Sequence, residues 1–324
     1  MYVTHRRQPR FDWFADSLAR QLGADDVEVV FVDGLRTRAR TALLTEVVRD
    51  RFSFRHVPPK PTPYCGPQRL TPTDLFAVAS ARNTGIVHTK QPYVVFVDDC
   101  ALLAPGWLDA VREGAVEGRV TCGTYEKHTN LVAADGLRVT SDLTEAGLDS
   151  RRQLGDGTGP VPLGGGQLYG CSFCAPRDLL LAVNGLDELC DPMGGEDYQL
   201  GIRLEWAGAQ IVYDRRMLTI ENSDADAHGD SPPRIGRSLP EDAYMAKLAE
   251  FGVGARSTGG EFDNSHMVLD ILYGTRSVQS VGNDYSLSEL RVSDLPRLPY
   301  QFPLDYWFDD LPLAEMSSDH SSQG

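Results

Sequence analysis

The 324-residue chain lacks the features typical of membrane proteins and disulfide-rich secreted proteins. No apolar run approaches the roughly 20 residues that span a bilayer, and no signal peptide opens the chain. Its six cysteines are scattered without a dense framework, which indicates reduced thiols. These absences predict a cytoplasmic protein with no membrane span.

Positive charge is also scarce. The chain has 31 Lys and Arg residues against 46 Asp and Glu residues, which gives a net charge of −15. Such a balance opposes a broad electrostatic grip on nucleic acid or on an anionic membrane. A nucleic-acid acceptor held at a local site stays possible but is not favoured. The length and a hydrophobic content of 41% allow a substantial core.

Two short acidic stretches carry the strongest signal. Residues 94–99 form an apolar run that ends in two aspartates, and residues 194–197 form a Gly-Gly turn followed by Glu-Asp. A buried strand with carboxylates at its carboxyl end brings them to the edge where open α/β sheets bind ligands. Carboxylates suit a divalent cation that holds a diphosphate, and one can accept a proton from an attacking hydroxyl. Together the stretches predict group transfer from a nucleotide-activated donor.

Each stretch also has a plainer interpretation. An acidic pair at a strand end often only begins a loop. Acids in the first turn of a helix are favoured by the helix dipole, which predicts a low pKa for Glu196 and Asp197.

The remaining pattern predicts an α/β protein. Residues 1–35 are typical of a strand, a helix and a strand, which implies a parallel sheet with right-handed crossovers. A helix is expected from Thr73 or Asp74 to about Val87, and a strand at 93–98. From about residue 119 the pattern indicates short strands and loops, including a strand at 210–213.

We expect three regions along the chain. Residues 1–230 form the catalytic domain, and residues 231–316 form an irregular extension that packs on it. Residues 317–324 form a disordered tail.

Five segments, in this order, resemble family 2 glycosyltransferases of the GT-A fold. They are Asp33 after the second strand, residues 81–86, residues 95–99, residues 184–188 and residues 194–197. The Gly-Gly-Glu-Asp run is also similar to one in animal galactosyltransferases, and residues 56–110 and the tail resemble glycosyltransferase-like proteins of bacteria and phages. The resemblance implies a Rossmann-like mixed, mostly parallel sheet flanked by helices. It also implies metal-dependent, inverting transfer from a nucleotide diphosphate sugar, expected to be UDP-linked, to a hydroxyl acceptor.

The resemblance further implies a role for each matching residue. Thr4 and Asp33 would line the pocket for the nucleotide base, Arg82 would steady the nucleotide, and Asp98 would contact the ribose. Asp99 would bind the metal, Asp197 would be the general base, and Glu196 would orient the acceptor or support the base.

One departure from the family affects the metal site. Cys100 stands where the family often has a third acid, and a thiol is a poor ligand for Mg²⁺. His228 lies where related enzymes often place a metal-binding histidine, and Mn²⁺ accepts imidazole more readily than Mg²⁺ does. We therefore expect Mn²⁺ or Mg²⁺ on Asp99 and His228, with an exposed loop histidine as the alternative for residue 228.

Other functions remain open at this point. The acceptor can be a saccharide, another hydroxyl compound, or a hydroxymethylpyrimidine-type base in DNA. A nucleotidyltransferase also uses acid-ended strands, but it needs a Gly-rich basic loop that residues 1–12 do not contain. A non-catalytic protein that binds a sugar nucleotide is disfavoured by the intact Asp98, Asp99 and Asp197.

Two less specific candidates complete the site. Lys60, Gln68 and Arg69, in a proline-rich loop, could reach a diphosphate. The glycine run 164–166 could form the acceptor floor or a tight structural turn.

Overall fold

The computed structural model describes residues 1–23, 27–60, 65–66, 76–191, 195–224 and 306–310. The chain opens with β1 (Tyr2–Thr4), α1 (Phe11–Ala19) and β2 (Glu28–Asp33), and the two strands pair in parallel. This is the strand-helix-strand unit predicted for the first 35 residues. Next come α2 (Arg38–Val48) and β3 (Ser53–Val57), which extends the parallel sheet beyond β2.

The remaining elements complete one mixed sheet. They are α3 (Val78–His88), β4 (Tyr93–Asp98), β5 (Ala101–Leu103), α4 (Trp107–Gly114), β6 (Arg119–Ala134), β7 (Leu137–Leu148), β8 (Val161–Pro162), β9 (Ser172–Pro176), α5 (Arg177–Ala182), α6 (Glu196–Trp206) and β10 (Gln210–Asn222). The strand order is β3-β2-β1-β4-β9-β6-β10-β5, with β7 beside β6 and β8 beside β10. The predicted α/β class is confirmed, with parallel pairing along β3-β2-β1-β4 and between β6 and β10.

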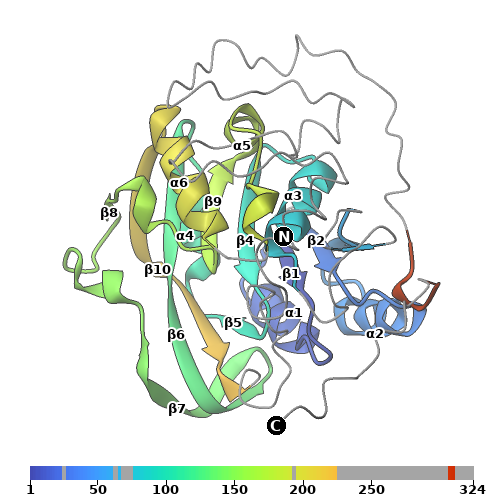
Figure 1. The fold of residues 1–324 in the computed structure, drawn as a ribbon. Helices are drawn as coiled ribbons and strands as arrows, with labels where there is room; N and C mark the ends of the chain where they lie inside the picture. Colours follow the sequence, from blue (N-terminus) through green and yellow to red (C-terminus); the bar gives the residue numbers. More distant parts are fainter. Residues whose placement is uncertain (24–26, 61–64, 67–75, 192–194, 225–305, 311–324) are drawn as a thin grey trace, which may run out of the picture.

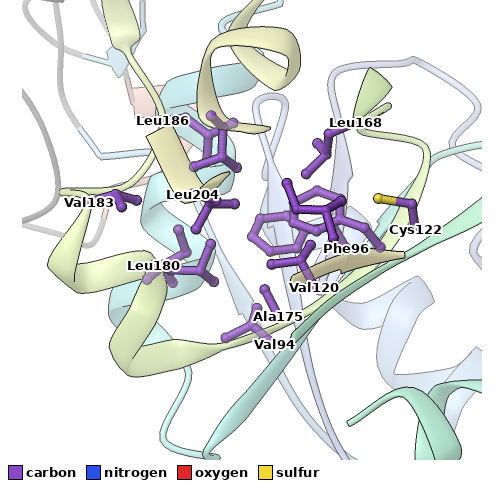
Figure 2. Close-up of a cluster of buried hydrophobic side chains, with 14 of the residues drawn as sticks. Val94, Phe96, Val120, Cys122, Leu168, Ala175, Leu180, Val183, Leu186 and Leu204 are labelled. Atoms are coloured by element: carbon purple, nitrogen blue, oxygen red, sulfur yellow. The ribbon is translucent and has the colours of Figure 1, made fainter. Parts of the chain in front are cut away.

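Helices cover both faces of the sheet (Figure 1). On one face α3, α5 and α6 pack over β4, β6, β9 and β10, and Leu180, Leu186 and Leu204 lie close to Phe96 there (Figure 2). At the centre of this cluster the Phe96 and Phe173 rings stack with centroids 4.0 Å apart. On the other face α1, α2 and α4 pack over β1, β2, β4 and β5. The sheet is therefore rigid behind the edge that carries the predicted site residues.

The second half of the sheet differs from the short strands expected there. β6 spans 16 residues, β7 spans 12 and β10 spans 13. Polar residues and Gly123 interrupt the apolar pattern of β6, and most of β7 is exposed, so neither gives a long hydrophobic signal. Their length comes from pairing with neighbouring strands, which depends on tertiary context rather than local pattern.

The start of α3 also differs from the expectation. The helix begins at Val78, and the expected caps Thr73 and Asp74 lie outside the described residues. Its first amides are instead bound by Asp191, whose carboxylate accepts from the Ala79 amide at 2.5 Å and the Ser80 amide at 3.1 Å. A carboxylate from a distant segment thus does the work of a local cap.

Only residues 306–310 of the expected extension are described, and they lie beside α2 (Figure 1). The Arg36 guanidinium stacks over the Trp307 ring at 3.8 Å, and Arg38 forms an ion pair with Asp310. The division of the chain at residue 230 stays a prediction. No helix in the described part of the chain is long and apolar enough to cross a membrane.

Candidate functional site

The predicted donor-binding residues lie along one edge of the sheet, which we call the carboxyl edge. It is defined by Thr4, Asp33 and Asp98, the last residues of β1, β2 and β4. Thr4 is in register with Asp33, and Val3 is in register with Asp98. The strand order reverses between β1 and β4, which is the point where open α/β sheets bind ligands.

Asp99 follows β4 and is held by residues from the β1 loop. Its carboxylate accepts from Thr4 Oγ1 at 2.6 Å and forms an ion pair with Arg6 Nε at 2.8 Å. Burial and the neighbouring Asp98 raise the pKa of Asp99, although Arg6 and Thr4 oppose the shift. Thr4, predicted to line the base pocket, thus orients the predicted metal ligand in this structure.

A tight turn begins directly after Asp98, the last residue of β4, and includes Asp99. Cys100, between β4 and β5, adopts a left-handed conformation with φ 56°, and its amide donates to the Tyr2 hydroxyl at 3.1 Å. The carboxylates consequently diverge, because Asp99 binds Arg6 while Asp98 binds Arg82.

Arg82, on α3, joins the two acidic stretches. Its Nη2 lies 2.8 Å from Asp98 Oδ1, and its Nη1 lies 2.8 Å from Glu196 Oε1. Only 3% of Arg82 is exposed. Burial opposes its charge, but Asp98, Glu196 and Asp197 together raise its pKa above the usual value. One buried cation therefore fixes the start of α6 against the end of β4.

Glu196 departs from the low pKa expected at a helix start. Burial raises the pKa of Glu196, and the Asp197 charge adds to the shift, although Arg82 opposes it. The residue is only 7% exposed, so desolvation outweighs the helix dipole.

Asp197 is held by backbone amides. Its Oδ2 accepts from the Gly170 amide at 2.9 Å, and its Oδ1 accepts from its neighbour, the Tyr198 amide, at 2.7 Å. Among the described residues no basic side chain forms an ion pair with Asp197, and its side chain is partly exposed. The arrangement fixes the orientation of a carboxylate while leaving lone pairs available.

Asp33 is completely buried and fully bonded. It accepts from Arg40 Nε at 2.7 Å and Nη2 at 3.0 Å, from His56 at 3.2 Å, and from the Leu35 amide at 2.9 Å. Burial raises the pKa of Asp33, but His56 and Arg40 outweigh it and hold the value below the usual range. A nucleotide base would meet this carboxylate only by exchanging one of those partners.

Lys60 does not point to a diphosphate site. Its Nζ is buried and lies 2.6 Å from Glu188 Oε2, which also ties the 188–191 segment to the sheet. The other loop candidates, Gln68 and Arg69, and the predicted metal ligand His228 lie outside the described residues.

No family model and no curated protein matches this chain. Among solved structures, S. aureus TarS 1-349 in complex with UDP-GlcNAc matches with a TM-score of 0.51 and 14% identity, over 76% of this chain and 63% of that one. The fold is that of the GT-A glycosyltransferases. At this identity the likeness extends to the fold alone.

Two further structures align less well. GalNAc-T7 with UDP, GalNAc and Mn²⁺ gives a TM-score of 0.49 at 12% identity, over 68% of this chain and 43% of that one. The Pyrobaculum calidifontis mannosyltransferase PcManGT with GDP-Man and Mn²⁺ gives 0.45 at 15% identity, over 80% and 65%. The chain spans less than two thirds of the length of each of these three structures.

Glu221, the penultimate residue of β10, had no predicted role. Its neighbour Asn222 donates from its amide to the Cys100 carbonyl at 3.1 Å, which places Glu221 beside the aspartate turn. Its Oε1 is buried, and no described group hydrogen-bonds to it. Burial, together with Asp98, raises the pKa of Glu221 to about 8. An acid at a strand end was the available signal, but the strand was expected to stop at residue 213.

Two tyrosines adjoin Asp197 or its amide donor Gly170 in the chain, and a third lies beside one of them. Tyr169 precedes Gly170, its ring lies 6.3 Å from that of Tyr125, and the Arg151 guanidinium stacks on it at 4.0 Å. Tyr198 follows Asp197 and is 52% exposed. Half-exposed aromatic rings beside a carboxylate offer an apolar face with polar groups at its rim.

The glycine run 164–166 is a structural turn. It leads into a 3₁₀ helix, Gly165–Gln167, which packs on α6 so closely that a side chain at Gly165 would meet the Gly201 backbone. At Gly165 the close approach expected from these glycines is therefore between backbone and backbone, whereas Gly166 faces the Tyr198 ring.

Proposed function

We propose that the chain is a metal-dependent, inverting glycosyltransferase of the family 2 type, which moves a sugar from a nucleotide diphosphate donor, expected to be UDP-linked, to a hydroxyl acceptor. The observation that carries the proposal is the placement of Asp197. Two backbone amides orient it, and Arg82 links the adjacent Glu196 to Asp98 at the carboxyl edge.

The chemistry follows from this placement. The acceptor oxygen forms a bond to the anomeric carbon while the bond from that carbon to the diphosphate oxygen breaks on the opposite side, which inverts the configuration. Asp197 takes the proton of the acceptor hydroxyl, and the diphosphate leaves with the electron pair of the broken bond. Glu196, anchored by Arg82, keeps the first turn of α6 in place beside the reacting atoms.

The donor roles remain those implied by the resemblance. Asp33 and Thr4 face the base, Arg82 steadies the nucleotide, and Asp98 binds the ribose. Because Asp33, Asp98 and Asp99 each already hold an arginine, donor binding must exchange part of those ion pairs. Arg6, released from Asp99, is then a cation within reach of a diphosphate.

The residues present fit a hard divalent cation, Mn²⁺ or Mg²⁺. Glu221 contributes a buried oxygen that no described group hydrogen-bonds, and Asp99 lies at the neighbouring turn. In the described part of the chain no three His, Cys, Asp or Glu side chains are arranged to hold an ion, so donor oxygens must complete the ligand set. Asp99 and Glu221 would hold the ion, with His228 as the further proposed ligand. When bound, it would neutralise charge on the leaving diphosphate.

A saccharide is the acceptor that the site supports best. Tyr169 and Tyr198, which adjoin Gly170 and Asp197 in the chain, offer apolar faces and hydroxyls that suit a sugar ring, and Tyr125 lies beside Tyr169. The net charge of −15 weighs against a DNA acceptor.

The test is a thermal-shift panel of UDP-sugars and GDP-sugars, each with and without Mn²⁺. We expect one nucleotide sugar to raise the melting temperature, and to do so much more strongly with the metal. The Asp99→Asn variant should lose the metal-dependent part, whereas the exposed Asp178→Asn variant should respond like the wild type. If no nucleotide sugar stabilises the protein under either condition, the proposal is rejected.

A further inference from the structure

Gly170 stands between the two halves of the site. Its amide donates to Asp197 Oδ2 at 2.9 Å, so the residue orients the proposed base. On its other side it faces Arg82, because a Cβ built on Gly170 would lie 2.2 Å from Nη2, 2.4 Å from Nη1 and 2.5 Å from Cζ of that arginine. A side chain at position 170 therefore cannot coexist with the observed guanidinium.

Arg82 has little freedom to yield. A flexible side chain on the surface could swing away from a new methyl group, but Arg82 is 3% exposed and its guanidinium is held by two carboxylates. Moving it stretches the 2.8 Å contact with Asp98, the 2.8 Å contact with Glu196, or both. The alternative is to move the Gly170 backbone, which carries the amide that holds Asp197.

We propose that Gly170 is a positioning residue that fixes the place of the Asp197 carboxylate relative to the donor side of the site. Its amide fixes the carboxylate, and its lack of a side chain makes room for the arginine that ties α6 to β4. This role rests on the proposed glycosyltransfer, because it predicts how that reaction fails when Asp197 is displaced.

Position 170 acquires this role from the sheet. β9 runs antiparallel to β4 and places Ser172 opposite Val97, so the residues just before β9 lie against the end of β4. The Asp98 amide donates to the Cys171 carbonyl at 3.2 Å, which ties this segment to the carboxyl edge. Backbone pairing of the residues that follow it thus holds Gly170 in place. The displacement caused by a methyl group there would therefore pass to Arg82 and Asp197.

The test compares Gly170→Ala with Gly159→Ala, in which the added methyl meets no atom within 4 Å. The measurement is steady-state turnover of the UDP-sugar or GDP-sugar that stabilises the wild type. We expect Gly170→Ala to lower kcat by about 100-fold, as a misplacement of about 1 Å does, with a smaller change in KM. Gly159→Ala should keep wild-type kcat and KM.

A double-mutant cycle identifies the cause. Arg82→Lys removes the guanidinium group that the added methyl would meet. Relative to Arg82→Lys alone, the double variant with Gly170→Ala should therefore lose only roughly a few-fold in kcat, because the effects of residues in contact are not additive. Additive losses in kcat would overturn the proposal. A normal kcat in Gly170→Ala, with coupling between positions 170 and 82 seen only in the urea midpoints, would also overturn it. That result would make the contact purely structural.

The two proposals fail in different ways. If the wild type turns over no nucleotide sugar, the proposed function fails, and the urea midpoints of the same four proteins decide whether Gly170 and Arg82 are coupled. Additive midpoints would then overturn the positioning role as well. If the wild type is active and Gly170→Ala matches Gly159→Ala, the function stands and the positioning role is wrong.

Discussion

The two sides of the site treat their acids differently. On the side of β1, β2 and β4, each aspartate is neutralised by an arginine: Asp33 by Arg40, Asp98 by Arg82 and Asp99 by Arg6. On the side of α6 and β10, Glu196 shares Arg82 with Asp98, but Asp197 rests on backbone amides, and Glu221 keeps an oxygen that no described group hydrogen-bonds.

This difference separates two tasks. In the proposed function, the ion pairs fix the positions of the donor-side acids until a charged ligand exchanges them. Amide donors orient Asp197 without an ion pair to any described basic side chain, so its remaining lone pairs stay open to the proposed acceptor hydroxyl. The variants below test this division, from the largest expected effect to the smallest.

Asp197→Asn should have the largest effect, because it removes the proposed base while keeping the shape of the side chain. We expect turnover to fall by about 10²–10⁴-fold, while the thermal shift caused by the donor is retained. Asp178→Asn, an exposed acid in the first turn of α5, is the matched control. Turnover near the wild-type rate would remove Asp197 from the role of base.

Arg82→Met tests the link between the two sides. It leaves Asp98 and Glu196 without their buried cation, so we expect a loss of about 3 kcal/mol of unfolding free energy, discounted for the partial exposure of Asp98. Urea denaturation measures it. Arg38→Met, which breaks an ion pair exposed to solvent, should cost much less. Equal costs would show that the buried link adds nothing.

Glu221→Gln tests the buried acid of β10 through the pH dependence of stability, in protein treated with a chelator. The folded pKa of about 8 lies above the usual value for a glutamate, so the folded state retains a proton that the unfolded state has lost. Wild-type stability should therefore fall as pH rises towards 8 and level off above it. The variant should lose this slope in a melting-temperature series, whereas Glu117→Gln, at an exposed turn, should keep it.

Trp307→Ala should give the smallest effect. Its ring lies 3.8 Å from the guanidinium of Arg36, whose backbone amide donates to the Asp33 carbonyl at 3.1 Å. We expect a loss of about 1 kcal/mol of unfolding free energy, measured by urea denaturation, with turnover close to wild type. A large loss of donor binding would extend the donor side to residues 306–310.

Much of the donor side could be predicted from the sequence, because its residues lie at strand ends. Asp33 and Asp98 are each the last residue of an apolar run, and parallel pairing brings such ends to one edge. The placement of Asp197 at the start of a helix was also predicted correctly, since a glycine turn precedes it. Their assigned roles remain predictions.

The partners of these acids could not be predicted. Arg82 is 114 residues from Glu196, and Arg6 is 93 residues from Asp99, so no local pattern joins them. Glu221 was missed because the polar end of β10 hides the length of the strand. The role of Gly170 depends on a steric contact with Arg82, which exists only in the folded chain.

The conformation of Cys100 limits how the proposed metal site can be redesigned. Because φ is positive there and the residue is 2% exposed, its side chain is enclosed by the protein, with Sγ 3.6 Å from the Gln8 carbonyl oxygen. Cys100→Asp would place an acid where the glycosyltransferases that the sequence resembles often have one. It would bury a charge within the fold instead of adding a metal ligand. Redesign for tighter cation binding should therefore begin at the end of β10, where no described group hydrogen-bonds to the buried Oε1 of Glu221.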